Sequence, residues 1–213
     1  RVLRRAKWER ELVAHEGVVR WELLEGKSES LKGAQFIRPG DGSFLVQGVN
    51  AANDRYTVET VAPLDEIYSL RLEALTHESL VKTGPGRARN GNFVLSEIQV
   101  RTTDGVLHSF AAAFADHSQK DFEISGAIDG DSKTGWAVNG SPEGGPNHRR
   151  VAVFNFTQPV SVVDGTRLVV TLAFGHGKGG YNLGRFRLSV ASSLVTRADP
   201  MRTERARIAA MPR

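Results

Sequence analysis

Apolar and polar residues alternate one by one through the middle of the chain, which is the period of a β-strand with one buried face. The longest clean alternation places Leu168, Val170, Leu172 and Phe174 on one face. Similar patterns recur between turns rich in Gly, Pro, Asn or Asp. They predict strands around residues 19–23, 44–46, 56–58, 70–74, 94–100, 152–156, 168–174 and 186–190.

The two ends of the chain follow a different pattern. Residues 1–15 lack Gly and Pro, and they predict a helix that ends near Gly17. Asp199 as a cap and Pro200 at the first position predict a second helix near the C-terminus. We therefore expect an all-β fold, an antiparallel β-sandwich of the jelly-roll type, with short helical N- and C-terminal extensions. The expected division is 1–17, 18–193 and 194–213, and the residues before Asp65 could form a separate half of the sandwich.

Composition excludes several classes of protein. The 213 residues include no cysteine, so a disulfide framework, a zinc ribbon and a thiol nucleophile are impossible. No apolar run approaches the roughly 20 residues of a membrane-spanning helix. The chain begins at Arg1 and has no signal peptide, which favours a segment of a longer protein.

The net charge of +4 comes from the ends of the chain. Residues 1–15 and residues 194–213 each hold five basic and two acidic residues, so together they carry +6 and the middle carries −2. A slightly acidic domain does not suit nucleic acid, and we expect none as a partner. The basic ends are more typical of solvated faces or of contacts to a neighbouring domain.

Three loops are rich in Gly and in polar side chains: residues 83–92, 137–150 and 175–185. Loops on a rigid β fold often carry binding groups, although such loops are as often simple turns. Tyr181 and Trp136 could each offer a ring face to a sugar. The candidate ligand-binding residues are Arg87, Arg89, Asn90, Asn92, Tyr181, Asn182 and Arg185.

A fourth loop, "SGAIDGDSKTGWAV", suggests a metal ion. Asp129, Asp131 and Thr134 place three hard oxygen ligands within six positions, and Ca²⁺ favours six to eight oxygens. Glu97 could add a ligand from a neighbouring strand. An equally good interpretation is an Asx-turn at Asp129 followed by a buried Trp136.

Two resemblances rest on these motifs. The stretch "AIDGDSKTGW", with "RRVAVFNFTQPV", "TRLVVTLAF" and "LGRFRLSV", resembles the galactose-binding-like, or discoidin-type, sandwich. In that family the alanine-x-Asp-Gly turn often holds structural calcium, which implies Asp129, Asp131 and Thr134 as ligands.

From residue 21 to residue 193, "DGSFLVQG", "GPGRARNGNFVLSEIQV" and "HSQKDFEISGAIDGDSKTGWAV" resemble a module of large secreted planctomycete proteins that contain a cytochrome c domain. This second resemblance implies export to the periplasm, the cell surface or the medium. It implies no haem here, because there is no C-x-x-C-H.

No catalytic motif stands out. The histidines lack the i, i+4 spacing of a helical zinc site, and there is no G-x-S-x-G elbow or phosphate-binding loop. Glu59, Glu73 and Glu97 lie at polar-facing positions of the expected strands, where solvated faces explain them. Carboxylates meeting in space could still make a glycosidase, and this is the weakest of three hypotheses.

The sequence thus predicts a non-catalytic carbohydrate-binding module of a larger secreted protein. Arginine forks would suit a sulfated or uronic glycan. The rival hypothesis is a structural spacer that packs on neighbouring domains of its parent chain.

Overall fold

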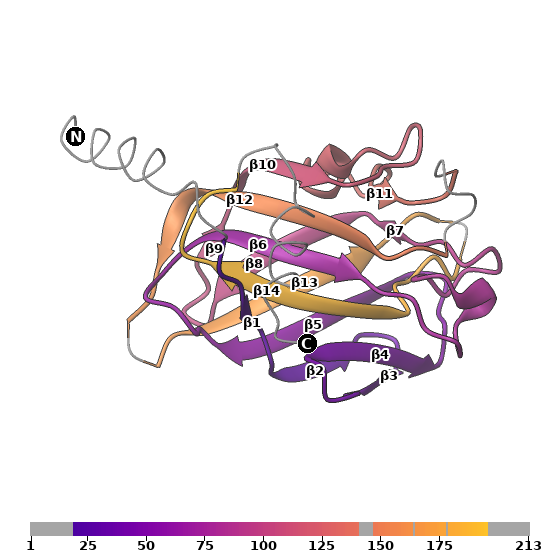
Figure 1. The fold of residues 1–213 in the computed structure, drawn as a ribbon, viewed down its shortest axis with the longest axis horizontal. Coiled ribbons are helices and arrows are strands. Elements are labelled where there is room, and N and C mark those ends of the chain that lie inside the picture. The colour runs from indigo at the N-terminus through magenta and orange to yellow at the C-terminus, as the bar shows by residue number, and fades with distance from the viewer. Residues whose placement is uncertain (1–18, 141–146, 164, 178, 196–213) are drawn as a thin grey trace, which may run out of the picture.

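A computed structural model of the protein describes residues 19–140, 147–163, 165–177 and 179–195 (Figure 1). The predicted helices at residues 1–17 and 194–213 lie outside this part, apart from Leu194 and Val195. In the described part all strand pairings are antiparallel, and the two helical segments are single 3-10 turns, η1 (Val81–Thr83) and η2 (Ile124–Ala127). The strands are β1 (Glu22–Leu23), β2 (Lys27–Ser30), β3 (Ala34–Ile37), β4 (Ser43–Gly48), β5 (Asp54–Val61), β6 (Glu66–Ala74), β7 (Val94–Leu95), β8 (Glu97–Thr102), β9 (Leu107–His108), β10 (Phe110–Ala115), β11 (Trp136–Ala137), β12 (Arg150–Ser161), β13 (Arg167–Phe174) and β14 (Arg185–Ala191).

Two sheets account for most of these strands. The larger has the order β10-β12-β6-β14-β4-β3, with β1 also paired to β14, and the smaller has the order β2-β5-β13-β8-β9. β7 and β11 form a separate two-stranded pair. The predicted all-β class with antiparallel sheets is confirmed.

One hydrophobic cluster joins the two sheets. Leu72 of β6 and Leu188 of β14 enter it from the larger sheet, and Val58 of β5 and Leu172 of β13 enter it from the smaller one. The alternation predicted for residues 168–174 is the alternation observed, because every second residue of β13 is buried. Strands from before and after Asp65 contribute to the same cluster, so the two halves share one core.

The outer face of the larger sheet is covered instead of solvated. Glu73 of β6 is fully buried there, and its carboxylate accepts hydrogen bonds from Arg187 Nε at 2.6 Å and from Arg149. Arg71 lies 3.4 Å away and places its guanidinium over the ring of Trp21. The expectation that Glu73 occupies a solvated face is wrong, because arginines surround it on that face.

A second, smaller cluster lies on this outer face. Val151 and Val153 of β12 pack there with Val195, Val19 and Trp21, which belong to the two ends of the described chain. The alternation of the strand predicted around residues 19–23 puts Val19, Trp21 and Leu23 on one face. Leu24 enters the main core in their place, and Leu23 is exposed.

The long connections gather at one end of the molecule. Register pairs Ala74 with both Arg150 and Phe186 in the larger sheet, and Phe174 with Asp54 in the smaller one. The connections that follow or precede these residues therefore meet, and in Figure 1 they lie on the right, next to β7 and β11. We call this the loop end, and its described residues are 49–53, 75–93, 116–140, 147–149, 175–177 and 179–184.

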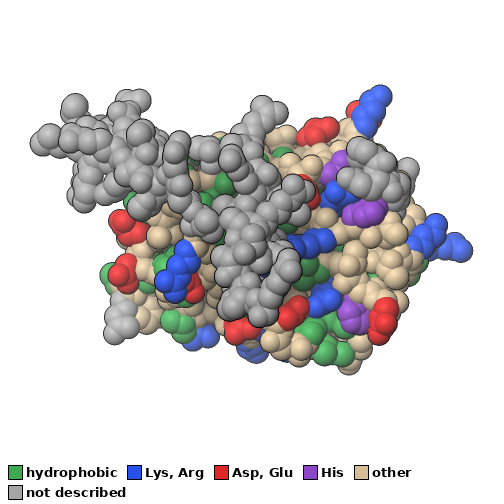
Figure 2. Space-filling view, viewed as in Figure 1, with side chains coloured by type: hydrophobic (Ala, Val, Ile, Leu, Met, Phe, Trp, Pro, Cys, Tyr) green, Lys and Arg blue, Asp and Glu red, His purple; other side chains and the backbone are tan. Residues whose placement is uncertain are grey.

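The described connections at the opposite end are shorter, and they include the turns at residues 62–65, 103–106, 162–163 and 165–166. Backbone bonds from Ala62 N–H to Thr166 O and from Val162 N–H to Asp65 O tie two of them together. Figure 2 shows one face of the molecule, on which acidic and basic side chains are interspersed in the described part. The features that differ most from ordinary turns are therefore at the loop end.

Candidate functional site

Hydrogen bonds between distant residues build the loop end. Asn182 Nδ2 donates to Asn50 Oδ1 at 2.7 Å and to the carbonyl of Ala51 at 2.9 Å. Asn50 Nδ2 in turn donates to the carbonyls of Arg87 and Gly180. Three connections, after β4, β6 and β13, are thereby held in one rigid arrangement.

Glycine at position 86 allows the closest of these approaches. A Cβ atom there would lie 1.9 Å from the carbonyl oxygen of Asn92, so a larger residue would force the backbone apart. Gly86 also forms an isolated bridge with Leu183. The Gly-rich composition of residues 83–92 therefore has a packing cause that needs no ligand.

Most predicted ligand-binding residues are used to hold the loops. Arg87 donates through Nη1 and Nη2 to the carbonyls of Val49 and Gly48, both at 2.7 Å. Asn92 and Asn182 are buried, and Asn92 bonds Gln119 and the N–H of Val138. These side chains already bond protein groups, and the one acceptor among them without a described partner, Asn182 Oδ1, is buried. They are therefore poorly placed to recognise a ligand as well.

Two further predicted residues also have local partners. The Asn90 side chain accepts a hydrogen bond from the N–H of Asn92, which makes an Asx-turn. Arg185 donates to Asp41, to Ser43 and to the carbonyl of Thr76, at the base of β14. Two of these partners, Asp41 and Ser43, lie outside the loop end.

Arg89 and Tyr181 are the predicted residues whose side chains make no hydrogen bond or ion pair within the described part of the chain. Arg89 is exposed, and Tyr181 is half-buried. His176 lies edge-on to Tyr181 with 6.2 Å between ring centroids, and edge-on to Phe122 at 4.9 Å. The three rings form a partly exposed cluster at the loop end, which we call the aromatic cluster.

Phe122 is the member of this cluster that the sequence reasoning missed. It lies in the turn between β10 and η2, whose Gln119 N–H donates to Ala137 O of β11 and whose Phe122 carbonyl accepts from Ala137 N–H. The feature of the sequence that could have pointed to Phe122 is its aromatic ring between two acidic residues, Asp121 and Glu123, outside any alternating run. Such a residue is either exposed or packed on another loop.

Trp136 is not available to a ligand. Its side chain is fully buried, its ring lies edge-on to Phe93, and its Nε1–H donates to the carbonyl of His117 at 2.9 Å. Of the two interpretations of this residue, a sugar-stacking face or a buried ring after the Asp129 turn, the structure supports the second.

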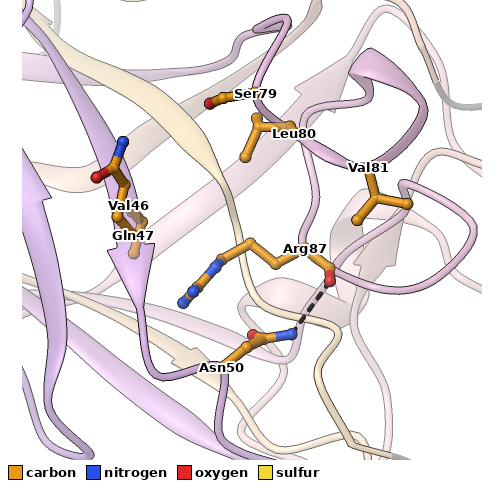
Figure 3. Close-up of a pocket in the computed structure, with 7 residues that line it drawn as sticks. All are labelled: Val46, Gln47, Asn50, Ser79, Leu80, Val81 and Arg87. Atoms are coloured by element: carbon orange, nitrogen blue, oxygen red, sulfur yellow. Dashed lines mark hydrogen bonds between the residues drawn. The ribbon is translucent and has the colours of Figure 1, made fainter.

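A shallow depression of about 320 Å³ lies between η1 and the end of β4. Figure 3 shows the Arg87 side chain lying across it, between Leu80 on one side and Asn50 on the other. Two guanidinium nitrogens of Arg87 are already bound to backbone carbonyls, as described above. The depression therefore presents few free polar groups.

Oxygen atoms converge on Thr134 in the turn that follows η2. Thr134 Oγ1 lies 2.9 Å from both carboxylate oxygens of Asp129, 2.8 Å from the carbonyl of Asp131 and 3.2 Å from the carbonyl of Gly126. One hydroxyl has one hydrogen, so it can satisfy only one of these acceptors at a time. Crowded oxygens of this kind are the ligands that Ca²⁺ prefers.

Glu97 of β8 lies beside the same turn. Its Oε1 accepts the N–H of Gly130 at 2.7 Å. Burial raises the pKa of Glu97 above its usual range, and the negative charge of Asp129 raises it further against that hydrogen bond. The carboxylate of Asp131 instead accepts the N–H of Lys133, so Asp131 faces the crowded oxygens with its carbonyl.

The described residues include no group of three or more His, Cys, Asp or Glu side chains arranged for a metal ion. The turn at Thr134 therefore fits a cation only through its mixture of carboxylate, hydroxyl and carbonyl oxygens. Among the described segments, no helix has the length and apolar character needed to cross a bilayer.

Comparison of the chain with protein-family models, with curated proteins and with solved structures gave no match.

Proposed function

We propose that this chain is a non-catalytic carbohydrate-binding domain of a larger exported bacterial protein, with a jelly-roll sandwich of the galactose-binding-like type. The observation that carries the proposal is the aromatic cluster at the loop end, where Tyr181 combines a half-exposed ring with a hydroxyl that has no described partner. The antiparallel sheets, their shared core and the long connections at one end are typical of such domains.

Sugar recognition needs an apolar face for the ring and polar groups for its hydroxyls. Tyr181 supplies both, and His176 and Phe122 support its ring from the side. Arg89 adds an exposed guanidinium, which would favour a sulfated or uronic glycan because its planar fork matches such anions. A glycan at this end is therefore the proposed partner.

The proposed absence of catalysis rests on how the carboxylates are used. Glu59 is paired with Arg167 at 2.7 Å, Glu73 with three arginines, and Glu97 with the turn at Gly130. Burial raises the pKa of Glu73, but the surrounding arginines outweigh it and hold the pKa low, whereas a general acid needs a raised pKa. Burial does raise the pKa of Glu97, but this carboxylate accepts the N–H of Gly130 in the turn proposed below to hold calcium.

Replacing Tyr181 by alanine is expected to weaken glycan binding by roughly tenfold or more, since removing an aromatic anchor from a binding site costs at least about 1.4 kcal/mol. Affinity electrophoresis in gels of plant and algal polysaccharides would first identify the ligand, and titration calorimetry would then measure both proteins. Tyr68→Ala is the matched control, because Tyr68 is also half-buried but lies on β6 near the short turns. Equal losses in both variants, or no retardation by any polysaccharide, would refute the proposal.

We also propose a structural calcium ion at the turn of Asp129, Asp131 and Thr134, with Glu97 nearby. The ion would draw the crowded oxygens together and offset the repulsion between Glu97 and Asp129. A ligand that binds only the folded state stabilises it, by about 2.7 kcal/mol at a hundredfold excess over Kd.

Adding a chelator is therefore expected to lower the melting temperature of the protein, and adding calcium back to restore it. Asp129→Asn should abolish this response, whereas Asp104→Asn, in a turn at the opposite end, should keep it. The chelator effect should shrink as the pH falls through the raised pKa of Glu97, because protonation competes with the cation. If chelator left the melting temperature unchanged at every pH, the proposed calcium site would be refuted.

The second candidate function is a structural spacer that packs on neighbouring domains. The covered outer face of the larger sheet favours it, because both ends of the described chain, Val19 with Trp21 and Val195, pack there on Val151 and Val153 and would meet neighbouring domains at fixed positions. The two proposals differ in one result: a spacer without a ligand would bind no polysaccharide in the assay above.

A further inference from the structure

Strand β10 leaves one side of the larger sheet open. Among the described residues its only strand partner is β12, on one side. The N–H of Asp116, just after the strand, donates to the carbonyl of Val151 at 3.1 Å. Because successive residues of an antiparallel strand direct their backbone groups to alternate sides, Ala113 and Ala115 direct theirs away from β12. These N–H and C=O groups lie along an unpaired edge.

This edge lacks the features that normally keep a strand from pairing with another chain. The sequence of β10, "FAAAFA", has no charge and no proline. The other three described edges of the two main sheets are blunted: β2 carries Lys27 and Glu29, β9 has only two residues, and β3 runs directly into Arg38 and Pro39. In the described part of the chain, β10 has a bulge between Phe110 and Ala112, which leaves a regular ladder over residues 112–115, and η2 lies against the strand.

We propose that β10 pairs with β10 of a second copy of this chain, antiparallel and around a two-fold axis at Ala113. The two Ala113 residues would then exchange two backbone hydrogen bonds. Ala112 of one copy would face Phe114 of the other. Both residues lie on the outer face, since they pair with Asn155 and Val153 of β12. Because a small side chain lies opposite a large one, the two strands can approach to hydrogen-bonding distance without a steric clash. No like charges face each other across the pair. The seven-stranded sheets of two copies thus become continuous.

The oligomeric state of the full chain tests this directly. Sedimentation velocity over a concentration series is expected to show a reversible dimer in the micromolar range. Ala111→Lys adds a charge at an exposed position of the same edge and should weaken the dimer at least about tenfold. Gln35→Lys, which adds the same charge to the exposed face of β3 at the other edge of the same sheet, should leave it unchanged. An equal effect of the two lysines would overturn the proposal.

A single cysteine reports the register, because the chain has none of its own. Two Ala113 residues on the axis would have Cα atoms about 5.5 Å apart, within the range of a disulfide. Ala113→Cys is therefore expected to form a disulfide-linked dimer on mild oxidation, and Gln35→Cys to form little. A chain that stays monomeric up to about 100 μM, far above micromolar affinity, and whose two cysteine variants cross-link equally slowly, would exclude the pairing.

Discussion

Replacing Glu73 with alanine is expected to lower the free energy of unfolding by about 3–5 kcal/mol, because removing one partner of a buried ionic group leaves its counter-charges uncompensated. The Glu73 carboxylate is fully buried and accepts from Arg187 at 2.6 Å and 2.8 Å and from Arg149, with Arg71 beside it. Without it, these guanidinium groups would repel one another on a covered face of the sheet. Urea denaturation followed by circular dichroism would measure the loss.

Glu59→Ala is the matched control for this prediction. Glu59 also pairs with an arginine, Arg167, at 2.7 Å, but both side chains are about two-fifths exposed. Exposed pairs of this kind contribute roughly 0–1 kcal/mol. Comparable losses from the two substitutions would mean that the burial of Glu73 has no energetic consequence.

The dependence on pH gives the Glu73 prediction a second readout. Burial raises the pKa of Glu73, but hydrogen bonds from Arg187 and the charges of Arg71, Arg187 and Arg149 outweigh burial and hold the pKa below its ordinary value of 4.5. A carboxyl with a depressed pKa stabilises the fold above its unfolded pKa, and this contribution fades as the pH falls through the folded value. The stability difference between the wild-type protein and Glu73→Gln should therefore be largest near neutral pH and narrow below about pH 4.5.

In strands such as β6, the pattern of alternation predicted which residues enter the main core but not whether the opposite face is covered. It placed Leu70, Leu72 and Ala74 correctly, and by the same rule it assigned the intervening Glu73 to solvent. A two-residue repeat of apolar and polar side chains distinguishes the two faces of a strand. It carries no information on whether the second face is covered by other residues. The covering residues, such as Trp21 and Val195, come from distant parts of the chain.

The alternation also missed strands without polar partners. β10 contains only Phe and Ala, so no polar residue marks a face, and its pairing with β12 depends on residues some forty positions away.

The predicted run over residues 94–100 is divided at Ser96 into β7 and β8, which belong to different sheets. Ser96 N–H donates to Ala173 O, and its hydroxyl accepts the N–H of Gly175, so tertiary contacts fix this break.

Loop composition identified the right region and too many residues in it. Arg87, Asn92 and Asn182 have side chains that often bind ligands. In this protein they form hydrogen bonds to carbonyls and amides of the loops instead. A buried polar side chain must find partners inside the fold, and a long loop offers many. Exposure, which the sequence does not encode locally, is what separates Arg89 and Tyr181 from the others.

Trp136→Ala is expected to destabilise the protein by about 3–5 kcal/mol, since it removes the largest side chain type from a fully buried position. The ring packs against Phe93, and its Nε1–H satisfies the carbonyl of His117, which lies just before the turn that carries Phe122. The loss should therefore reach the aromatic cluster through the pairing of Trp136 with Leu95 and of Ala137 with that turn. Thermal melting and glycan binding, measured on the same samples, would give both effects.

Trp136→Phe separates packing from hydrogen bonding at this position. Phenylalanine keeps most of the apolar contact with Phe93 but leaves the half-buried His117 carbonyl without its donor, which costs up to about 1–3 kcal/mol, the loss for a fully buried acceptor. We expect this variant to be less stable than the wild type, more stable than Trp136→Ala, and still able to bind glycan, because Tyr181 and its neighbours stay in place. If Trp136→Ala instead kept its melting temperature and lost only binding, the ring would have to contact the ligand, which contradicts its complete burial. The stability of Trp136→Ala therefore tests whether the Trp136 ring, which follows the Asp129 turn, packs in the core or contacts a sugar.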